Sequence, residues 1–389
     1  MRASNNYGAM ERNGTKRSKK ANIMGLAPAG RETGKRRARP AGAAAIPAIL
    51  AALCLCACGQ GGGLTGAPGA AGIADDAAHE KNVYAMVSKD AHNPYMKKAY
   101  EGFEAACREI GAEPMFRGPD VATPEWQIEI IDRLAEEGVD LISVTANDAD
   151  ALYPALHGAM EKGIKVISFD SAVNKDSRLV HVQQANPEQI GRVLAQAAYE
   201  MVEGEGGIAV LSTTSQATNQ NLWIEWMKAE LSENAGKYAK TPLITIVYGE
   251  DEPVKSTSVT RQLLSDPKIK VIVAPTAVGM AAAGKCLSDN GSTVLLTGLG
   301  MPSAMGEYIE SGVCPWMYLW NPVDLGYLAA YTGDALVNGQ IAGDVGDTFN
   351  AGNMGERVIT AAADGGTEAM LGDLFKFDQT NIAVWKEVY

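Results

Sequence analysis

Several polar side chains in this sequence could together bind a neutral polyol. Lys89, Asp170 and Gln220 each come shortly after a short apolar run, and Asn219 directly precedes Gln220. A carboxylate can accept hydrogen bonds from two adjacent hydroxyls, an amide can donate and accept at once, and an ammonium group donates to an oxygen. These residue types therefore predict a binding site for a small sugar-like molecule.

Each of these residues also has a purely structural interpretation. Asp170 could cap a helix, Asn219 and Gln220 could cap a helix that begins near residue 218, and Lys89 could be a solvated surface charge. In open α/β sheets, however, ligands bind outside the carboxyl ends of the strands, where the loops converge. The shared placement of these residues after successive predicted strands favours a common site.

The sequence does not predict a catalytic centre. Its four histidines are scattered, and no zinc-protease, serine-hydrolase or paired CxxC motif occurs after residue 58. Gly279 to Lys285 has the spacing of a phosphate-binding loop, but Cys286 replaces the Ser or Thr that would bind magnesium, and the intervening residues favour a helix. We therefore expect a binding protein without a cofactor or metal site, in which Cys107 and Cys314, like Cys286, serve as small hydrophobic residues.

The elements that must position the site alternate along the chain. Runs rich in Val and Ile predict strands at 82–87, 139–145, 164–169, 207–211, 243–248, 270–274 and 293–297. Periodic segments predict helices that begin at Pro94 and Pro124 and others at 150–162, 187–203, 218–234, 256–265, 277–289 and 322–338. Continuous apolar strands indicate parallel sheets, and their alternation with helices indicates right-handed crossovers. About 310 residues of this pattern exceed one core, so the predicted fold is α/β with two doubly wound parallel-sheet lobes.

The N-terminal residues predict export. Residues 1–57 carry a net charge of +9 and end in an uncharged run of 17 residues at 41–57, which together are typical of a signal peptide. The run closes on LCAC at 55–58, followed by glycine, which resembles a bacterial lipoprotein box. Cys58 is therefore expected to become the lipidated N-terminus of the mature chain. The Gly- and Ala-rich residues 58–79 cannot bury a core and predict a flexible tether.

The charge of the remaining chain limits its partners. Outside residues 1–57 the net charge is -21, which argues against nucleic acid or an anionic membrane surface as a partner of the folded part. The apolar run at 41–57 also argues against a transcriptional repressor, which would need a helix-turn-helix there. We expect an exported protein that is anchored to the cell membrane by its lipid alone and faces the periplasm or the cell surface.

Longer stretches resemble the periplasmic binding proteins of the ribose-binding type, over about residues 80–389. These stretches are Lys89 with NPY at 93–95, VISFDS at 166–171, HVQQANPEQIG at 181–191, ATNQN at 217–221, VIVAPTA at 271–277 and LWNPVDLGYLA at 319–329. Within that family the chain is most similar to the rhamnose-binding and autoinducer-2-binding branch of ABC transporter substrate-binding lipoproteins. The resemblance implies a monomer whose two lobes close on a small sugar such as rhamnose, or on autoinducer-2, and deliver it to the permease and ATPase subunits of an importer.

The resemblance also implies particular ligand contacts. The autoinducer-2-binding branch implies them at Lys89, Asp170, Gln220, Pro275 and Ala277, the last two through backbone groups. Position 219 departs from this branch, which has Asp where this chain has Asn219, whereas ATNQN is similar to the rhamnose-type members. An amide in place of an acid removes a charge and turns one acceptor into a donor, so both ligands remain possible. Trp320 would lie at a hinge beside the cavity and either stack on the ligand or pack between the lobes.

The same resemblance predicts the division of the chain into lobes. It places three crossings near 184–185, 320–321 and 349–351. The N-terminal lobe is then expected to comprise 80–184 with 321–350, and the C-terminal lobe 185–320 with 351–389. A lipoprotein that presents its ligand to a membrane receptor kinase would have the same lobes, and this sensor is the alternative function.

Overall fold

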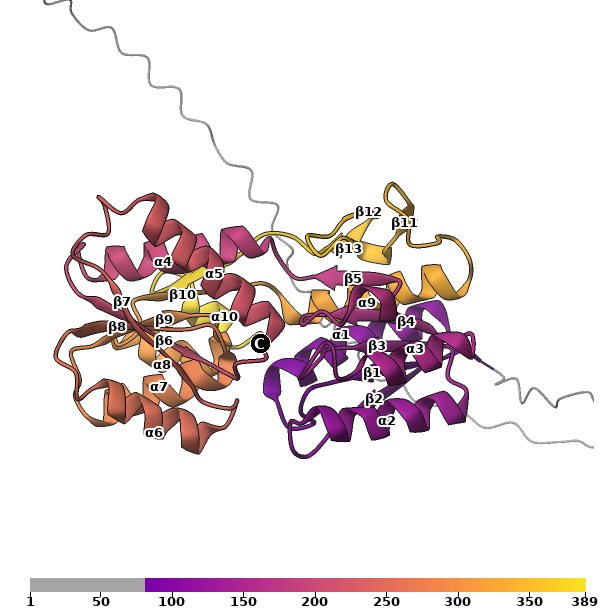
Figure 1. Cartoon of the computed structure of the whole chain (residues 1–389), viewed down its shortest axis with the longest axis horizontal. Helices are drawn as coiled ribbons and strands as arrows, with labels where there is room; N and C mark the ends of the chain where they lie inside the picture. Colours follow the sequence, from indigo (N-terminus) through magenta and orange to yellow (C-terminus); the bar gives the residue numbers. More distant parts are fainter. Residues whose placement is uncertain (1–80) are drawn as a thin grey trace, which may run out of the picture. The chain divides into compact units, whose positions relative to one another are not determined.

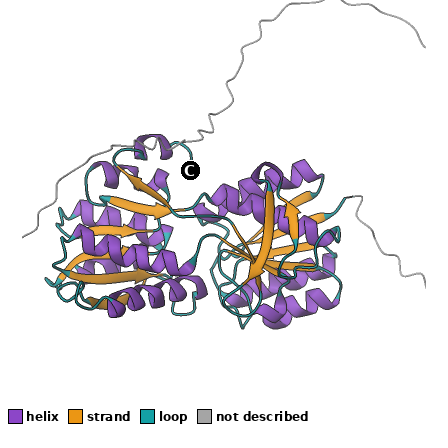
Figure 2. Cartoon of the chain, turned by 90° about the horizontal axis from the view of Figure 1, so that it is seen from above, coloured by secondary structure: helices purple, strands orange, loops and turns teal. Residues whose placement is uncertain are grey.

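The computed structural model describes residues 81–389 of the chain. The predicted signal peptide at 1–57, the lipidation site Cys58 and the tether at 58–79 lie outside the described residues. Two lobes can be followed in Figure 1, each built around its own sheet with helices packed against it. Figure 2 shows this layering from above, with strands between helices.

The N-terminal lobe contains an eight-stranded sheet in the order β11-β12-β13-β5-β4-β3-β1-β2. Its parallel strands are β1 (Val83–Val87), β2 (Glu113–Arg117), β3 (Leu141–Val144), β4 (Lys165–Phe169) and β5 (Val180–Gln183). The residues of β1 and β3 are all buried, as expected for strands that are covered on both faces. The sheet is extended by β13 (Thr367–Met370), β12 (Glu356–Ala361) and β11 (Thr348–Asn350), of which only β13 runs parallel to its neighbour β5.

Helices with sequence-encoded ends cover this sheet. They are α1 (Pro94–Ile110), α2 (Pro124–Glu137), α3 (Tyr153–Glu161) and α9 (Pro322–Val337), with the short 3-10 turns η1 (Lys175–Ser177) and η2 (Gly352–Met354). The side chain of Asn93 caps α1 by accepting from the N–H of Tyr95, and Gly111 ends the helix with a φ of 82°. The predicted inward face of α1 is buried at Ala99 and Phe103.

The C-terminal lobe contains a four-stranded parallel sheet in the order β7-β6-β8-β9. Its strands are β6 (Gly207–Ser212), β7 (Leu243–Tyr248), β8 (Ile269–Ala274) and β9 (Leu295–Gly298). An isolated bridge between Leu299 and Tyr318 connects β9 to the antiparallel pair β10 (Trp316–Leu319) and β14 (Phe375–Asp378). The helices are α4 (Pro187–Met201), α5 (Thr218–Glu233), α6 (Pro253–Leu263), α7 (Ala277–Asp289), α8 (Pro302–Glu310) and α10 (Ile382–Trp385).

This architecture confirms the predicted α/β fold with two parallel-sheet lobes. The segment from Gly279 to Lys285 lies inside α7, so it is a helix and not a phosphate-binding loop. The cysteines 107, 286 and 314 are buried and free of disulfides. None of the helices within residues 81–389 combines the length and the apolar composition of a membrane-spanning segment.

The predicted position of the third crossing is wrong. The chain moves between the two sheets after β5 and again after β10, but the expected crossing at 349–351 is followed by β12 and β13, which are still in the first sheet. Ala369 of β13 pairs with Val182 of β5, and the N–H of Leu371 donates to the carbonyl of Gln183. Residues 351–370 therefore belong to the sheet of the N-terminal lobe, and the chain leaves that sheet only between β13 and β14.

Candidate functional site

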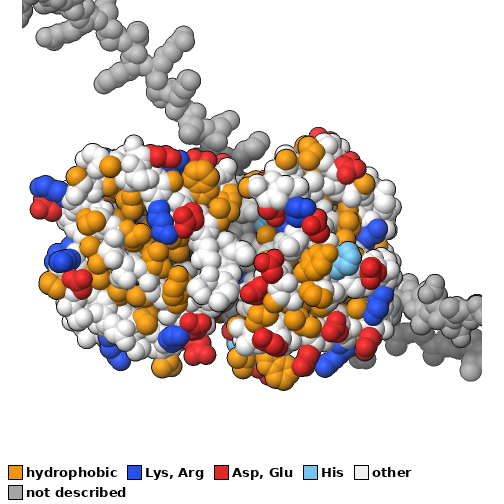
Figure 3. All heavy atoms as spheres, in the orientation of Figure 1, with side chains coloured by type: hydrophobic (Ala, Val, Ile, Leu, Met, Phe, Trp, Pro, Cys, Tyr) orange, Lys and Arg blue, Asp and Glu red, His pale blue; other side chains and the backbone are white. Residues whose placement is uncertain are grey.

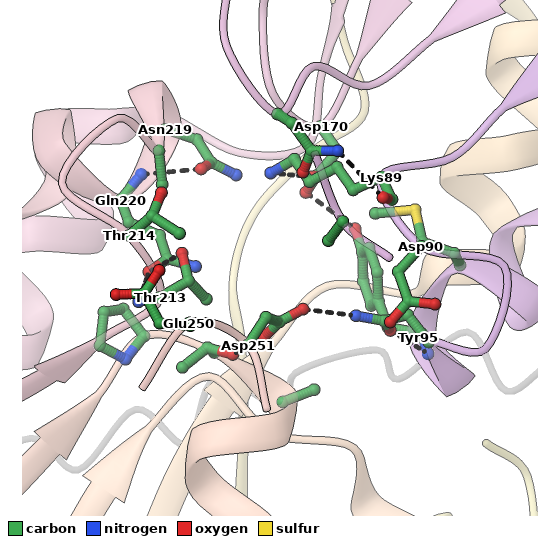
Figure 4. A pocket seen from close by; sticks show the side chains of 18 of the residues that line it. Lys89, Asp90, Tyr95, Asp170, Thr213, Thr214, Asn219, Gln220, Glu250 and Asp251 are labelled. Atoms are coloured by element: carbon green, nitrogen blue, oxygen red, sulfur yellow. Dashed lines mark hydrogen bonds and ion pairs between the residues drawn. The ribbon is translucent and has the colours of Figure 1, made fainter. Parts of the chain in front are cut away.

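A cavity of about 410 Å³ lies between the carboxyl ends of the strands of the two lobes. It is lined by all seven residues predicted to contact a ligand: Lys89, Asp170, Asn219, Gln220, Pro275, Ala277 and Trp320. Figure 4 shows Lys89 and Asp170 on one side of the cavity, facing Asn219 and Gln220 on the other. Five separate stretches of sequence thus meet at one place, and they approach it from both lobes.

Asp170 is the acceptor at the centre of the N-terminal side. It follows β4, is 6% exposed, and has a φ of 57°, in the left-handed region. Thr145 donates to its Oδ2 at 3.1 Å, Tyr95 donates to its Oδ1 at 3.4 Å, and the ammonium of Lys89 lies 3.6 Å from Oδ2. Lys89 also donates to the hydroxyl of Ser171. The lysine is therefore a partly buried donor paired with Asp170 and not a solvated surface charge.

Tyr95, Trp223 and Trp320 form an aromatic wall of the cavity near the second crossing. Trp320 is 3% exposed, and its indole N–H donates to the Tyr95 hydroxyl at 2.8 Å. Burial raises the pKa of Tyr95 well above its ordinary value, and the negative charge of Asp170 adds to this rise. The phenol therefore stays neutral. The ring centroids of Trp223 and Trp320 are 5.9 Å apart. Because its N–H is already used, Trp320 can offer a ligand only its ring surface.

On the C-terminal side, hydrogen bonds fix which way two amides point. The Gln220 Oε1 accepts from the hydroxyl of Ser212 at 2.7 Å, from the N–H of Thr213 at 2.9 Å and from its hydroxyl at 3.1 Å. Asn219 Oδ1 accepts from the N–H of Gln220 at 2.8 Å, so the Asn219 side chain binds a backbone N–H in the first turn of α5. The three bonds saturate the Gln220 oxygen, whereas the Asn219 oxygen accepts one and keeps a second lone pair. The amide N–H groups of both residues can donate to a ligand.

Pro275 and Ala277 bring backbone groups to the cavity. They flank the start of α7, where the first-turn N–H groups have no partner within the helix. Thr276 lies between them and donates its hydroxyl to Asp251 at 2.9 Å. This segment can therefore offer a ligand both carbonyl and N–H groups without a charged side chain.

Sequence reasoning missed the loop after β7, which brings Glu250 and Asp251 to the cavity. Burial raises the pKa of Asp251, against the hydrogen bond from Thr276 and the charge of Lys89, which lower it. The strand at 243–248 was predicted, so the polar residues after its carboxyl end could have been found by the rule applied to the other strands. Trp223 was also missed because it lies within a helix, where an aromatic residue indicates a core position.

A second hollow of about 840 Å³ adjoins the cavity beside the crossings and shares Asp170 and Asn219 with it. Its wall includes Arg178, which pairs with Asp364 at 2.6 Å, and His181. Burial, together with the charge of Arg178, lowers the pKa of His181 to about 3, so the imidazole is neutral. His181 bonds to Ser168 and to Gln183 within its own lobe, which is a structural role.

Taken together, the cavity has the chemistry of a binding site. It combines a carboxylate, an ammonium group, amide donors and aromatic rings, and residues 81–389 contain no cluster of three or more acidic, His or Cys side chains that could hold a metal. A model of the periplasmic binding protein domain matches residues 84–341. The chain belongs to the periplasmic binding protein family. The family consists of substrate-binding proteins, which confirms the prediction of a binding protein over an enzyme.

Solved structures of periplasmic binding proteins are similar to this chain over most of its length. An ABC transporter solute-binding protein from Clostridium phytofermentas with bound L-rhamnose is 46% identical, with a TM-score of 0.77 over 79% of this chain and 99% of that chain. A sugar ABC transporter protein from Actinomyces odontolyticus is 36% identical, with a TM-score of 0.63 over 78% and 96%. LsrB from Clostridium saccharobutylicum in complex with AI-2 is 20% identical, with a TM-score of 0.73 over 77% and 98%, which shows the shared fold alone.

Proposed function

We propose that this periplasmic binding protein is the solute-binding component of an ABC importer for a sugar, and that its ligand is L-rhamnose. The observation that carries the proposal is the cavity itself, in which a buried carboxylate and an ammonium group face two amide donors. A six-carbon sugar offers hydroxyls for all of these groups and an apolar ring face for Trp320. The 46% identity to a protein with bound L-rhamnose supports this choice of ligand.

Asn219 favours L-rhamnose over autoinducer-2. Its Oδ1 accepts the N–H of Gln220, which leaves its Nδ2 group as a donor for the cavity where the autoinducer-2-binding branch has an acid. An acid at this position would present an acceptor instead, which suits a different hydroxyl pattern. The relative that binds AI-2 shares only 20% identity and supports the fold without supporting that ligand.

The location and the transport partners are part of the same proposal. We propose that residues 1–57 are removed on export and that Cys58 is acylated, so that the binding lobes are tethered to the outer face of the cell membrane by residues 58–79. There the loaded protein would deliver its sugar to the permease and ATPase subunits. The protein acts as a monomer in this proposal.

Thermal unfolding of the chain without residues 1–58 tests the ligand. L-Rhamnose, autoinducer-2 and D-ribose are added separately at a hundredfold excess over the dissociation constant expected for an importer component. A ligand that binds only the folded state then adds about 2.7 kcal/mol, which is a clear upward shift of Tm. A shift with L-rhamnose alone supports the proposal. A shift with autoinducer-2 alone would replace the ligand, and a shift with none of the three would contradict the proposed function.

A further inference from the structure

A side-chain hydrogen bond joins the two lobes at the edge of the cavity. Asn93 Nδ2 donates to Asp251 Oδ2 at 3.0 Å, and Figure 4 shows Asp251 reaching toward the side of the cavity that carries Tyr95. Asn93 immediately precedes α1 in the N-terminal lobe, and Asp251 lies between β7 and α6 in the C-terminal lobe. The bond can form only when the two lobes are brought together over the cavity.

Asp251 is held firmly on its own lobe. Its Oδ1 accepts from the Thr276 hydroxyl at 2.9 Å, which leaves Oδ2 for the other lobe. The φ angles of Glu250 and Asp251 are 54° and 53°, so two adjacent residues with side chains adopt the left-handed conformation. Such a pair persists only where the surroundings hold it, and strained backbone of this kind concentrates at functional positions. Here the N–H groups of Gly249 and Glu250 donate to carbonyls of β6 and the residue after it, both at 2.9 Å.

Asn93 is oriented just as firmly on the opposite lobe. Its Oδ1 accepts from the N–H of Tyr95 at 2.9 Å as the N-cap of α1, so its amide nitrogen must point away from the helix. Each partner therefore uses one side-chain atom to anchor itself to its own lobe and the other atom to reach across. This is a preorganised pair, because little side-chain freedom is lost when the bond forms.

We propose that Asn93 and Asp251 form a latch that stabilises the closed arrangement of the lobes, with or without a ligand. Asp251 is a positioning residue in this latch, because it also holds Thr276, which lies between the cavity-lining residues Pro275 and Ala277. Closure of the lobes and the position of this backbone segment are thereby coupled through one carboxylate. The latch does not depend on which ligand the cavity accepts.

An exchange of the two side chains tests the latch. Asn93→Asp keeps the acceptor that caps α1 but places a carboxylate opposite Asp251. Asp251→Asn keeps the acceptor for Thr276 and tolerates the left-handed backbone, but places two amide nitrogens opposite each other. The double variant restores one donor and one acceptor, with their directions exchanged. A role confined to either lobe would not be rescued by this exchange.

The fraction of closed molecules is measured by single-molecule FRET on the full-length chain, without ligand and with L-rhamnose. The fluorophores are attached through unnatural keto side chains at positions 129 and 288, which are exposed on α2 and α7. We expect each single variant to lower the closed fraction of the ligand-free protein at least threefold, and the double variant to return it to within twofold of the wild type. With L-rhamnose bound, each single variant should release the sugar at least threefold faster.

Asn174→Asp is the matched control. Asn174 also caps a helical turn with Oδ1 and donates from Nδ2 to an acid, Asp150, but within one lobe. The closed fraction of the Asn174→Asp variant should equal that of the wild type. Circular dichroism should show that all variants are folded. An unchanged closed fraction in the single variants, or a double variant that stays open, would overturn the latch. A wild-type protein that fails to bind L-rhamnose would instead count against the proposed function, since the ligand-free measurement needs no ligand.

Discussion

At the scale of single residues, Asp170 should contribute most to ligand affinity. Asp170→Asn keeps the shape of the side chain and the left-handed backbone, for which Ala would be strained. It removes the charged acceptor and leaves Lys89 without its ionic partner in a partly buried position. Hydrogen bonds to charged groups contribute about 1.5–3 kcal/mol, so L-rhamnose affinity should fall roughly 10- to 100-fold in isothermal titration calorimetry.

Asp176→Asn is the control for that measurement. Asp176 lies in η1 with its side chain 64% exposed, outside the wall of the cavity, so the same chemical change there should leave affinity unaltered. Equal affinity of the Asp170 variant and the wild type would remove Asp170 from the site. Sequence reasoning found Asp170 because it follows a clear apolar strand. It could not show that Tyr95, Thr145 and Lys89 converge on it, because those contacts join residues far apart in the chain.

At the scale of elements, close packing of α1 against α9 sets the geometry of the aromatic wall. A Cβ at Gly326 would lie 1.7 Å from the carbonyl oxygen of Ala99, and one at Gly102 would lie 1.8 Å from that of Val323. Helix α1 carries Tyr95, and α9 begins shortly after Trp320. The hydrogen bond between these two side chains therefore depends on the distance between the two helices. Gly326→Ala should therefore destabilise the fold by about 1–3 kcal/mol, measured by urea denaturation.

Gly158→Ala provides the comparison, because a Cβ at Gly158 on α3 meets no atom within 4 Å. There the higher helix propensity of Ala should leave stability unchanged or raise it by up to about 1 kcal/mol. If both variants had the same stability, the close approach of α1 and α9 would not be essential. Sequence analysis predicted both helices from their caps and periodicity, but it could not predict this contact, since a glycine inside a helix does not reveal what packs against it.

Three of the strands that sequence analysis missed share a physical character. Strands β2, β11 and β12 lie at or near an edge of the sheet, and most of their side chains are exposed or half-buried, so their sequences lack the apolar runs of β1 and β3. For the same reason the third crossing was placed about twenty residues too early. A central strand is specified by burial on both faces, whereas an edge strand is specified largely by its neighbour, which the local sequence does not contain.

At the scale of the whole molecule, the proposed lipid anchor decides where the binding lobes act. If Cys58 is acylated, the full-length chain expressed in a bacterium should partition into the detergent phase of a Triton X-114 extract, because each buried methylene adds about 0.8 kcal/mol and two or more chains give stable anchoring. Cys58→Ser removes the acceptor thiol and should move the protein to the aqueous phase.

The control is Cys56→Ser, two residues earlier. It changes a thiol that is removed with the signal peptide in this proposal, so this variant should partition like the wild type. A detergent-phase Cys58→Ser protein, or an aqueous Cys56→Ser protein, would show that the anchor is not at Cys58. Because the tether adds no binding group of its own, L-rhamnose affinity should be the same for all three proteins, so that anchoring changes the place of capture and not its chemistry.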